Sequence, residues 1–311
     1  MTAPRSEIAT DLSLVALAAI WGINFSVMKV LLVELDPLAL NALRFPLAVA
    51  ALALLLRGDA QPTLPDREDL PRIVLLGVLG NVVYQLCFVF GIDGTQAGNA
   101  SLLLSTTPVW TVLLSGLAGH ERPTPAVVVG VLGTVVGMTF VVLGRGDALS
   151  LTSATLRGDL LMVLASILWS FYTVGGRGAV AKYGPVRMTA WTLWVGTPCL
   201  VAIGLPSVMR TDLASLSLGT WLGVTYAGLL SIGLAYLIWY RGVQRLGNTK
   251  TAAYSNLVPV AALITAWVWL GEVPTRVQLL GATIILIGLT VARLAQSPGP
   301  SSRRWRISGN S

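Results

Sequence analysis

Two stretches of equal length decide the fold: residues 108–124 read PVWTVLLSGLAGHERPT, and residues 259–275 read PVAALITAWVWLGEVPT. Each begins with proline and ends with Glu-x-Pro-Thr, and an offset of 151 residues superimposes them. The identities at this offset include Pro108 and Pro259, Glu121 and Glu272, Pro123 and Pro274, Thr124 and Thr275, Gly130 and Gly281, and Gly137 and Gly288. Six identities at one offset indicate an internal duplication.

The duplication extends toward the beginning of each copy. The pairs at an offset of 148 are Trp21 with Trp169 and Pro37 with Pro185. We therefore predict two five-helix repeats, residues 1–150 and residues 151–311. Since five is odd, the second copy must enter the membrane from the opposite side, which makes this an inverted-topology repeat. Such repeats typically enclose a central cavity that opens to each side in turn.

Composition places these repeats in a membrane. Of the 311 residues, 54% are hydrophobic and 11% are charged, whereas soluble domains are about one quarter charged. Apolar runs of about 20 residues, the length that crosses a bilayer as a helix, recur along the chain. They lack the alternation of a membrane β-barrel, so the sequence predicts an all-α integral membrane protein with ten transmembrane helices. The predicted spans are 12–33, 37–56, 71–92, 96–118, 125–144, 156–176, 185–206, 217–240, 249–270 and 276–295.

Basic residues indicate how these spans are oriented. The net charge is +7 and the pI is about 9.8, but the basic residues lie between apolar runs, so they report orientation in the membrane and not binding to nucleic acid. With the N-terminus in the cytoplasm, fifteen basic residues lie on the cytoplasmic side and five on the other. We expect a multi-pass protein of the inner (cytoplasmic) membrane with both termini, including the basic tail at 303–306, in the cytoplasm.

Three motifs resemble those of a known family. The first is Trp21-Gly22-x-Asn24-Phe25, followed by Lys29, Pro37 and Arg44. The other two end the halves: Gly98-Asn99-Ala100 to Pro108 with Glu121, Pro123 and Gly130, and Thr249 to Pro259 with Glu272, Pro274 and Gly281. In their order, spacing and duplication, over nearly the whole chain, they resemble the drug/metabolite transporter superfamily, in the ten-helix exporter branch called EamA.

The resemblance implies a function and a path. It implies that the first, third, fourth, sixth, eighth and ninth spans line the path, that the fifth and tenth stand away from it, and that amino acids or other metabolites are exported. The second half departs from the motif, because Ser170 replaces Gly22 and Thr192 replaces Arg44. We therefore do not expect the two halves to contribute equally to the site.

The distribution of charged residues excludes several substrate classes. All fourteen acidic residues fall in predicted loops or near helix ends, which argues against cationic drugs and against proton antiport through a buried carboxylate. Phosphate-bearing substrates need several cations at mid-membrane, and only Arg44 lies even partly there. An unpaired charge at that depth is costly, so Arg44 either binds a substrate carboxylate or pairs with Glu34, Asp36 or backbone carbonyls to hold its helix in place.

Enzymatic signals are poor. The single histidine, His120, lies at a loop edge, so neither a histidine metal cluster nor a Ser–His–Asp arrangement is supported. No ATP-binding motif occurs. We expect no catalytic residue, no metal and no cofactor.

Aromatic and amide side chains inside the spans form the candidate substrate site. Trp21 and Trp169 occupy matching mid-span positions, and we expect the pseudo-twofold axis to bring them to opposite walls of the cavity. Buried amides and phenols need partners, so some face each other or a wet cavity, although interhelical packing is an equal alternative for each one. The predicted substrate-binding residues are Trp21, Asn24, Tyr84, Asn99, Ser105, Trp110, Trp169, Tyr236, Tyr254 and Asn256. The same spans also carry Asn81, Gln85, Thr106, Trp239, Tyr240 and Ser255.

Prolines and glycines add two structural expectations. Pro108 and Pro259 are predicted in mid-helix, where a missing N–H kinks the helix and frees carbonyls near residues 104 and 255. These kinks either serve in gating or are static packing features. Close packing between spans 125–144 and 276–295 is expected from small residues on their faces, which are Gly130, Gly137, Gly281 and Gly288.

Together these features predict a transporter that exports neutral or aromatic amino acids, or similar small metabolites, by alternating access. Aromatic walls with a few amides suit zwitterionic molecules with apolar side chains. The expected partners are such a solute and the lipid bilayer. The alternatives are a lipid-interacting membrane protein or scramblase, and an exporter of neutral drugs.

Overall fold

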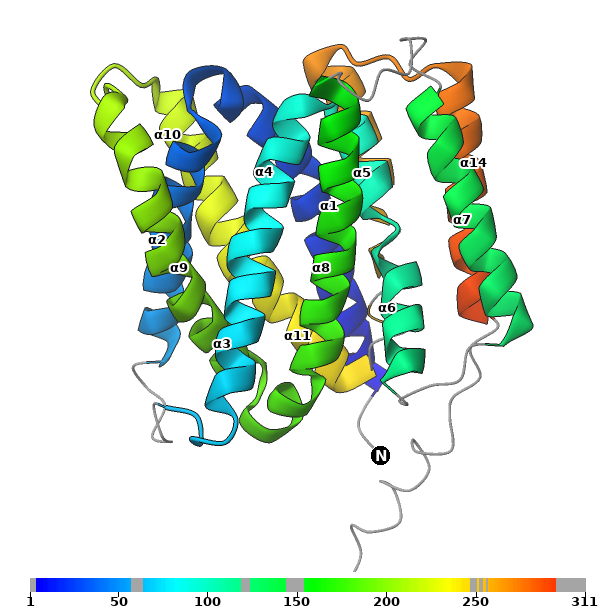
Figure 1. The fold of residues 1–311 in the computed structure, drawn as a ribbon, viewed down its shortest axis with the longest axis horizontal. Coiled ribbons are helices and arrows are strands. Elements are labelled where there is room, and N and C mark those ends of the chain that lie inside the picture. The colour runs from blue at the N-terminus through cyan, green and yellow to red at the C-terminus, as the bar shows by residue number, and fades with distance from the viewer. Residues whose placement is uncertain are drawn as a thin grey trace, which may run out of the picture.

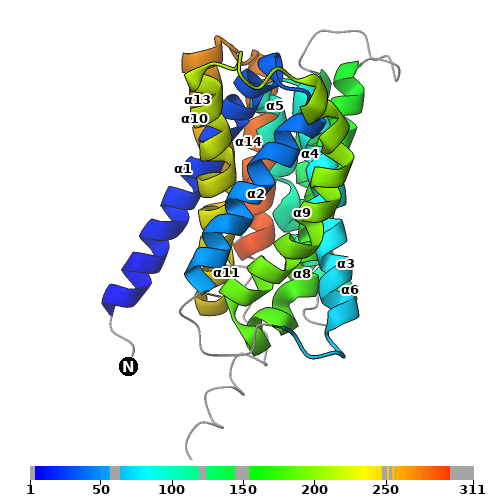
Figure 2. The same ribbon diagram turned by 90° about the vertical axis from the view of Figure 1, so that its left-hand side faces the viewer.

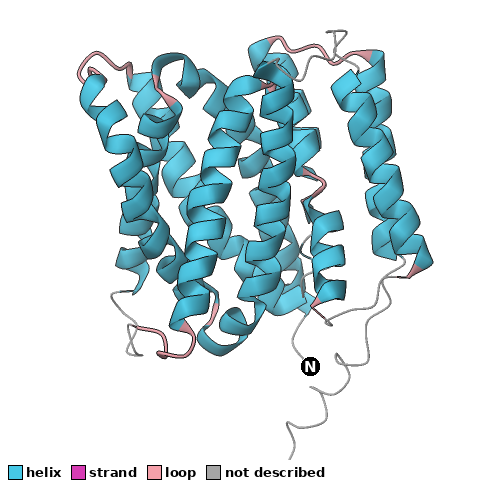
Figure 3. Cartoon of the chain, viewed as in Figure 1, coloured by secondary structure: helices cyan, strands magenta, loops and turns pink. Residues whose placement is uncertain are grey.

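The computed structural model describes residues 4–56, 64–118, 124–143, 154–246, 251, 254–255 and 257–294. This part of the chain is helical, without strands, and the helices run between the two ends of one bundle (Figures 1 and 3). Apolar sequence without polar faces favours helices whose backbone groups pair internally, as lipid requires.

The first two helices of each half are long, and all but the first helix of the second half begin at a proline. They are α1 (Pro4–Glu34), α2 (Pro37–Leu56), α8 (Ala154–Tyr183) and α9 (Pro185–Arg210). Proline suits the first turn because its missing N–H has no helical partner there. The helices α1 and α8 run in opposite directions (Figure 1), and α2 packs along α9 (Figure 2).

The next helix of each half contains a π-helical segment. In the first half α3 (Leu70–Val78) continues through η1 (Leu79–Val83) into α4 (Tyr84–Gly94), and in the second α10 (Leu218–Thr225) continues through η2 (Tyr226–Leu234) into α11 (Ala235–Leu246). Such wider turns are rare and often accompany functional sites.

The following helix is interrupted in the first half. The helix α5 (Ala97–Leu104) ends and α6 (Thr107–Leu117) begins after Ser105 and Thr106. The expectation that one continuous helix passes through Pro108 is wrong, because Pro108 lies in the first turn of α6. The expected disruption near this proline is present, since the apolar stretch Ala97–Leu117 breaks just before it. Pro259 likewise lies in the first turn of α13 (Leu257–Thr265), which continues into η3 (Ala266–Leu270).

The last helices of the two halves form a pair. The helices α7 (Pro125–Leu143) and α14 (Arg276–Leu294) lie side by side along their lengths (Figure 1). Their contacts with the rest of the bundle are fewer, mainly from α7 to α5 and from α14 to α6.

Seven helical stretches of the described chain are long and apolar enough to cross a membrane. They are Ile8–Glu34, Pro37–Leu54, Leu70–Gly94, Ala97–Leu117, Thr155–Tyr183, Pro185–Arg210 and Leu218–Arg245. Shorter apolar helices occupy Leu257–Leu270 and Arg276–Gly288. The architecture is that of a multi-pass helical membrane protein.

Candidate substrate cavity

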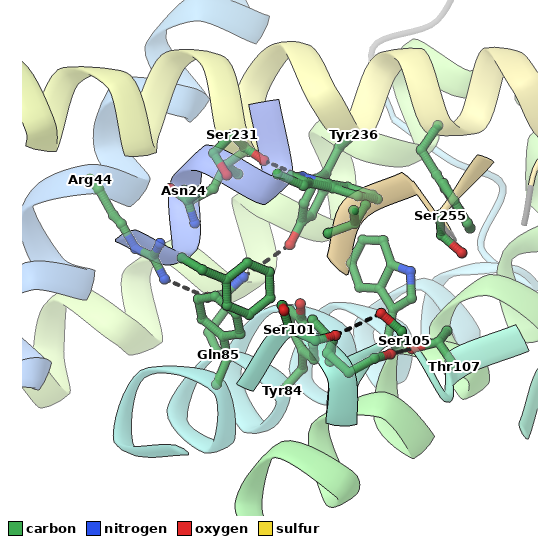
Figure 4. A pocket seen from close by; sticks show the side chains of 18 residues that line it. Asn24, Arg44, Tyr84, Gln85, Ser101, Ser105, Thr107, Ser231, Tyr236 and Ser255 are labelled. Atoms are coloured by element: carbon green, nitrogen blue, oxygen red, sulfur yellow. Dashed lines mark hydrogen bonds between the residues drawn. The ribbon is translucent and has the colours of Figure 1, made fainter. Parts of the chain in front are cut away.

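A cavity lies inside the bundle between the two halves of the chain (Figure 4). Its empty space of about 670 Å³ includes the part that is open to solvent. Its lining comes from α1, α2, α4, α5, α6, α8, η2, α11 and α13, and from Ser105 and Ser255. The lining residues are Trp21, Asn24, Phe25, Arg44, Tyr84, Gln85, Phe88, Ser101, Leu104, Ser105, Thr107, Trp169, Ser231, Ile232, Tyr236, Trp239, Ser255 and Val258.

Aromatic rings form one continuous wall of this cavity. The ring centroids of Trp21 and Trp169 are 5.8 Å apart and the rings are nearly perpendicular, at 88°. Trp169 also contacts Tyr84 at 5.1 Å and Tyr236 at 4.9 Å. The two tryptophans therefore touch edge to face, whereas we expected them on opposite walls. Edge-to-face contacts of this kind stabilise the arrangement of the rings.

A π-helical segment anchors Trp21. The indole Nε1 of Trp21 donates a hydrogen bond of 2.9 Å to the backbone carbonyl of Ser231, which lies in η2. The hydrogen-bond pattern of η2 departs from that of an α-helix, and the Trp21 indole takes a carbonyl of this segment as its partner. This bond fixes the ring at the edge of the cavity.

Arg44 lines the cavity and has no carboxylate partner among the residues that the structure describes. Its side chain is 1% exposed, and its guanidinium bonds the amide oxygens of Asn41 and Gln85 and the sulfur of Met28. Of the alternatives that the sequence left open for Arg44, pairing with Glu34 or Asp36 is wrong. Glu34 accepts instead from the hydroxyl of Thr220, and Asp36 from the backbone N–H of Leu38.

Gln85 joins this charged end to the aromatic wall. Its Oε1 accepts from Arg44 at 2.6 Å, and its Nε2 donates to the hydroxyl of Tyr236 at 2.9 Å. The chain Arg44–Gln85–Tyr236 thus connects α2, α4 and α11. Both polar ends of one amide are satisfied, so its orientation is fixed.

Among the described residues, two other buried polar atoms that belong to lining residues have no hydrogen-bond partner. They are the Oδ1 of Asn24 and the indole Nε1 of Trp239. The side chains are 4% and 2% exposed. Unpaired polar atoms at such burial cost free energy, so each is a candidate contact for a bound solute.

The remaining predicted residues lie elsewhere. Asn99 accepts from Gln278 of α14 at 2.8 Å and lines a second, smaller cavity between α5 and α14. The indole of Trp110 donates to Thr106, and the hydroxyl of Tyr254 donates to Asp11. Asn256 lies outside the described residues. Of the ten predicted contacts, the cavity lining thus includes Trp21, Asn24, Tyr84, Ser105, Trp169 and Tyr236.

The motif prolines and glycines take structural positions. Pro108 and Pro259 start helices and do not line the cavity. A Cβ added at Gly137 would lie 2.7 Å from the carbonyl oxygen of Gly281, and one at Gly133 would lie 3.7 Å from the Cα of Gly288. Gly130 is buried on the same helix. These glycines allow α7 and α14 to approach closely.

Glu272, one of the repeated motif residues, caps a cavity-lining helix. Its two carboxylate oxygens accept hydrogen bonds from the backbone N–H groups of Ala97 and Gly98, at 3.2 and 3.1 Å. A carboxylate satisfies unpaired N–H groups and interacts favourably with the dipole at a helix N-terminus. Glu272 thereby ties the loop after η3 to α5, which carries Ser101. The counterpart Glu121 and its neighbour Pro123 lie outside the described residues.

The predicted site omitted several lining residues. Trp239 follows Tyr236 by three residues, and this spacing on one helix face was a usable signal. Gln85 adjoins Tyr84 in the sequence. Ser231 had no signal, because a π-helical segment cannot be recognised from an apolar sequence.

Asp159 lies near the start of α8, as expected, but the residue is only 2% exposed. Its carboxylate accepts a hydrogen bond of 2.7 Å from the hydroxyl of Thr95.

A multi-pass helical bundle with a cavity between its halves is typical of a membrane transporter. The EamA-like transporter family model matches this chain over residues 8–143 and again over residues 156–294. The chain belongs to the EamA-like transporter family, as the sequence motifs predicted. Its function is therefore transport and not catalysis.

Similar proteins are consistent with this assignment. The chain is 32% identical over 247 residues to the uncharacterized transporter YdfC of Bacillus subtilis (strain 168), which covers 79% of this chain and 78% of that protein. It is 29% identical over 297 residues to a "Probable terminal-alkyne amino-acid exporter" of Streptantibioticus cattleyicolor. This match covers 94% of this chain and 97% of that protein. A solved crystal structure superimposes on 92% of this chain and on 97% of the chain in that structure, with a TM-score of 0.67. At 22% sequence identity, this similarity shows the fold alone.

Proposed function

We propose that this transporter exports neutral or aromatic amino acids, or similar small metabolites, by alternating access. The observation that carries this proposal is the aromatic wall of Trp21, Trp169, Tyr84 and Tyr236 around a cavity between the two halves. Aromatic faces bind apolar side chains, and the few amide and hydroxyl groups suit the polar end of a zwitterion. The amino-acid exporter among the similar proteins supports the same substrate class.

The proposed architecture is ten transmembrane helices in two inverted five-helix repeats, residues 1–150 and 151–311. Two separate matches to one family model support the duplication, and the opposite directions of α1 and α8 support the inversion (Figure 1). Positive-inside bias supports two cytoplasmic termini in the inner membrane. Reporter fusions after Arg57 and after Arg145 should read opposite sides, and a same-side result would contradict the inverted repeat.

Transport is tested with purified protein in liposomes. The proposal expects uptake of radiolabelled phenylalanine or leucine above that of protein-free liposomes, with saturation at high concentration. Lipid flip-flop is measured on the same vesicles with a fluorescent phospholipid. Flip-flop without amino-acid flux would favour a scramblase, and flux of a neutral drug alone would favour a drug exporter.

A further inference from the structure

The guanidinium of Arg44 is fixed at the cavity wall. Arg44 is in the second turn of α2, and α2 is packed between α9 and η2. A Cβ added at Gly228 of η2 would lie 2.5 Å from the carbonyl oxygen of Arg44, so the two backbones are already in contact. With 1% of the residue exposed, the charge stays at the cavity and does not reach the membrane surface.

The hydrogen bonds of this guanidinium leave its charge uncompensated. Nε and Nη2 donate to Asn41 Oδ1 at 3.1 and 2.9 Å, and Nη2 also donates to Gln85 Oε1 at 2.6 Å. In the part of the chain that the structure describes, Nη1 meets only the sulfur of Met28, at 3.1 Å. A thioether is a weak acceptor, and Nη1 carries two hydrogens. Among the described residues, no acidic side chain bonds or pairs with Arg44.

The rest of the cavity contains complementary groups for a solute. Asn24 and Trp239 belong to the cavity lining. Within the described part of the chain, the buried Oδ1 of Asn24 is an unpaired acceptor and the buried Nε1 of Trp239 an unpaired donor. Arg44, Asn24 and Gln85 lie toward one end of the cavity in Figure 4, and Ser105, Thr107 and Ser255 toward the other. The aromatic wall lies between them. The described lining includes no Asp or Glu.

From this arrangement we propose that Arg44 is the anchor for the carboxylate of the transported solute. The substrate class is a small monocarboxylate with an apolar body. Nη1 of Arg44 donates hydrogen bonds to the carboxylate. Asn24 Oδ1 accepts a hydrogen bond from an N–H group where the solute has one, and the rings of Trp21 and Trp169 pack against the apolar body. This inference rests on the proposed function and narrows it, because amines that lack a carboxylate are excluded.

Electrostatics decides between a carboxylate and an amine. A buried, unpaired cation is expensive, and a carboxylate at hydrogen-bond distance offsets that cost. An amine without a carboxylate would place a second positive charge beside Arg44 in a cavity of low dielectric constant. The ammonium of an amino acid is tolerated because its own carboxylate accompanies it.

The test compares four solutes that share one ring. Phenylalanine, 3-phenylpropionate, phenylalaninamide and phenethylamine compete with radiolabelled phenylalanine for uptake into liposomes that contain the wild-type protein. Phenylpropionate should inhibit within about tenfold of phenylalanine, whereas the amide and the amine should be weaker by about a hundredfold. Equal inhibition by the acid and the amine would overturn the anchor while leaving amino-acid export intact.

Variants locate the effect at Arg44. Arg44→Gln keeps polar contacts with Asn41 and Gln85 but removes the charge, and it should raise the KM for phenylalanine by about a hundredfold. Thr192→Val, at the counterpart position outside the cavity, should leave the KM unchanged. Should Arg44→Gln not fold, the solute series on the wild-type protein gives the answer without it.

Binding separates this proposal from the transport proposal. Thermal stabilisation of the detergent-purified protein is measured with each of the four solutes. Stabilisation by the two carboxylates and not by the amide or amine supports the anchor even when no flux is observed, in which case export alone is contradicted. Equal stabilisation by the carboxylates and by the amide or amine would overturn the anchor. The absence of both stabilisation and flux would overturn it as well.

Discussion

Arg44 on α2 and Thr192 on α9 are counterparts in the two repeats, 148 residues apart, and their helices pack against each other. Their side chains differ in chemistry and in the residues that they contact. A glycine packs against the backbone of each: an added Cβ at Gly228 would lie 2.5 Å from the Arg44 carbonyl oxygen, and one at Gly77 would lie 3.0 Å from the Thr192 carbonyl oxygen. Gly77 and Gly228 are themselves 151 residues apart. The backbone surroundings are duplicated.

The side chains have diverged within that common backbone. Arg44 lines the cavity, whereas the hydroxyl of Thr192 pairs with the hydroxyl of Tyr172 at 2.8 Å and donates to the Met188 carbonyl. Trp21 and Trp169, in contrast, both line the cavity. The comparison teaches that a duplicated backbone supports aromatic side chains from both halves and a charged side chain from the first half alone.

The largest expected effect breaks the duplicated backbone contact. Gly228→Ala places a methyl group against a backbone oxygen that cannot retreat, and overpacking of this kind costs about 1–3 kcal/mol or more. Gly77→Ala meets the Val195 Cβ at 2.8 Å and should be destabilising as well. Both variants should lower the melting temperature and the monodisperse yield in detergent.

Gly233→Ala is the matched control, because it lies in the same π-helical segment with its nearest neighbour 3.6 Å away. It should keep the wild-type melting temperature. Equal stability of Gly228→Ala and Gly233→Ala would show that the close approach to Arg44 is not needed.

The next effect concerns the aromatic wall. Trp21→Ala and Trp169→Ala should each weaken the apparent affinity for an aromatic amino acid by about tenfold, since buried aromatic contacts contribute on the order of 1 kcal/mol or more. Trp169→Ala should be the more severe, because Trp169 contacts five rings and Trp21 three among the described aromatic pairs.

These affinities are measured by uptake into liposomes at matched protein amounts. Trp267→Ala, on the exposed surface of η3, is the control for losing an indole. Unchanged affinity and rate in both cavity variants would remove the tryptophans from the site, and a uniform loss of folding would identify them as packing residues.

Much of the fold followed from the sequence, because apolar runs of spanning length constrain a membrane helix strongly. The bounds of α2 match the predicted span 37–56. What failed was local: Pro108 was placed in mid-helix because the stretch around it is long enough to form one span. The sequence Ser105-Thr106-Thr107-Pro108 is a signal for the start of a helix, and it marks the two-residue break. Helix interruptions depend on side-chain hydroxyls, such as Thr107 bonding the Leu104 carbonyl at 2.6 Å.

The site was predictable where position along a span was enough. Trp21, Tyr84 and Tyr236 line the cavity because they lie in the central part of spanning stretches that surround it. Asn99 and Tyr254 have the same chemistry but find partners on other elements, Gln278 and Asp11. Such pairings join residues more than 170 positions apart, and one sequence carries no information about them.

A smaller effect sharpens the contrast at the counterpart position. Thr192→Val removes one partner of the buried Tyr172 hydroxyl and should cost about 1–2 kcal/mol of stability. Transport should keep its KM, because Thr192 does not line the cavity. Thr283→Val on the exposed face of α14 controls for loss of a hydroxyl that bonds its own helix. A large rise in the KM for Thr192→Val would mean that both counterpart residues act in recognition.

The smallest expected effect lies outside the cavity, where α8 meets the loop before α3. Lys182 pairs with Asp66 at 2.7 Å and with Asp69 at 2.6 Å. Hydrogen bonds from Lys182 and then from Tyr183 hold the pKa of both carboxyl groups below their usual value. Because the groups are exposed, the cluster contributes little and is weakened by salt.

Lys182→Gln should therefore lower the melting temperature slightly at pH 7 and low ionic strength. An aspartate whose folded pKa is depressed stabilises the protein above its unfolded pKa, about 3.9, and loses that stabilisation as the pH falls through the folded value. The difference between wild type and variant should therefore persist down to about pH 4 and shrink below it. Arg210→Gln, which removes an exposed charge at the end of α9, is the control measured by the same thermal scans in detergent. A difference that is constant through the acid range, or equal to that of Arg210→Gln, would mean that the carboxylates do not act through Lys182.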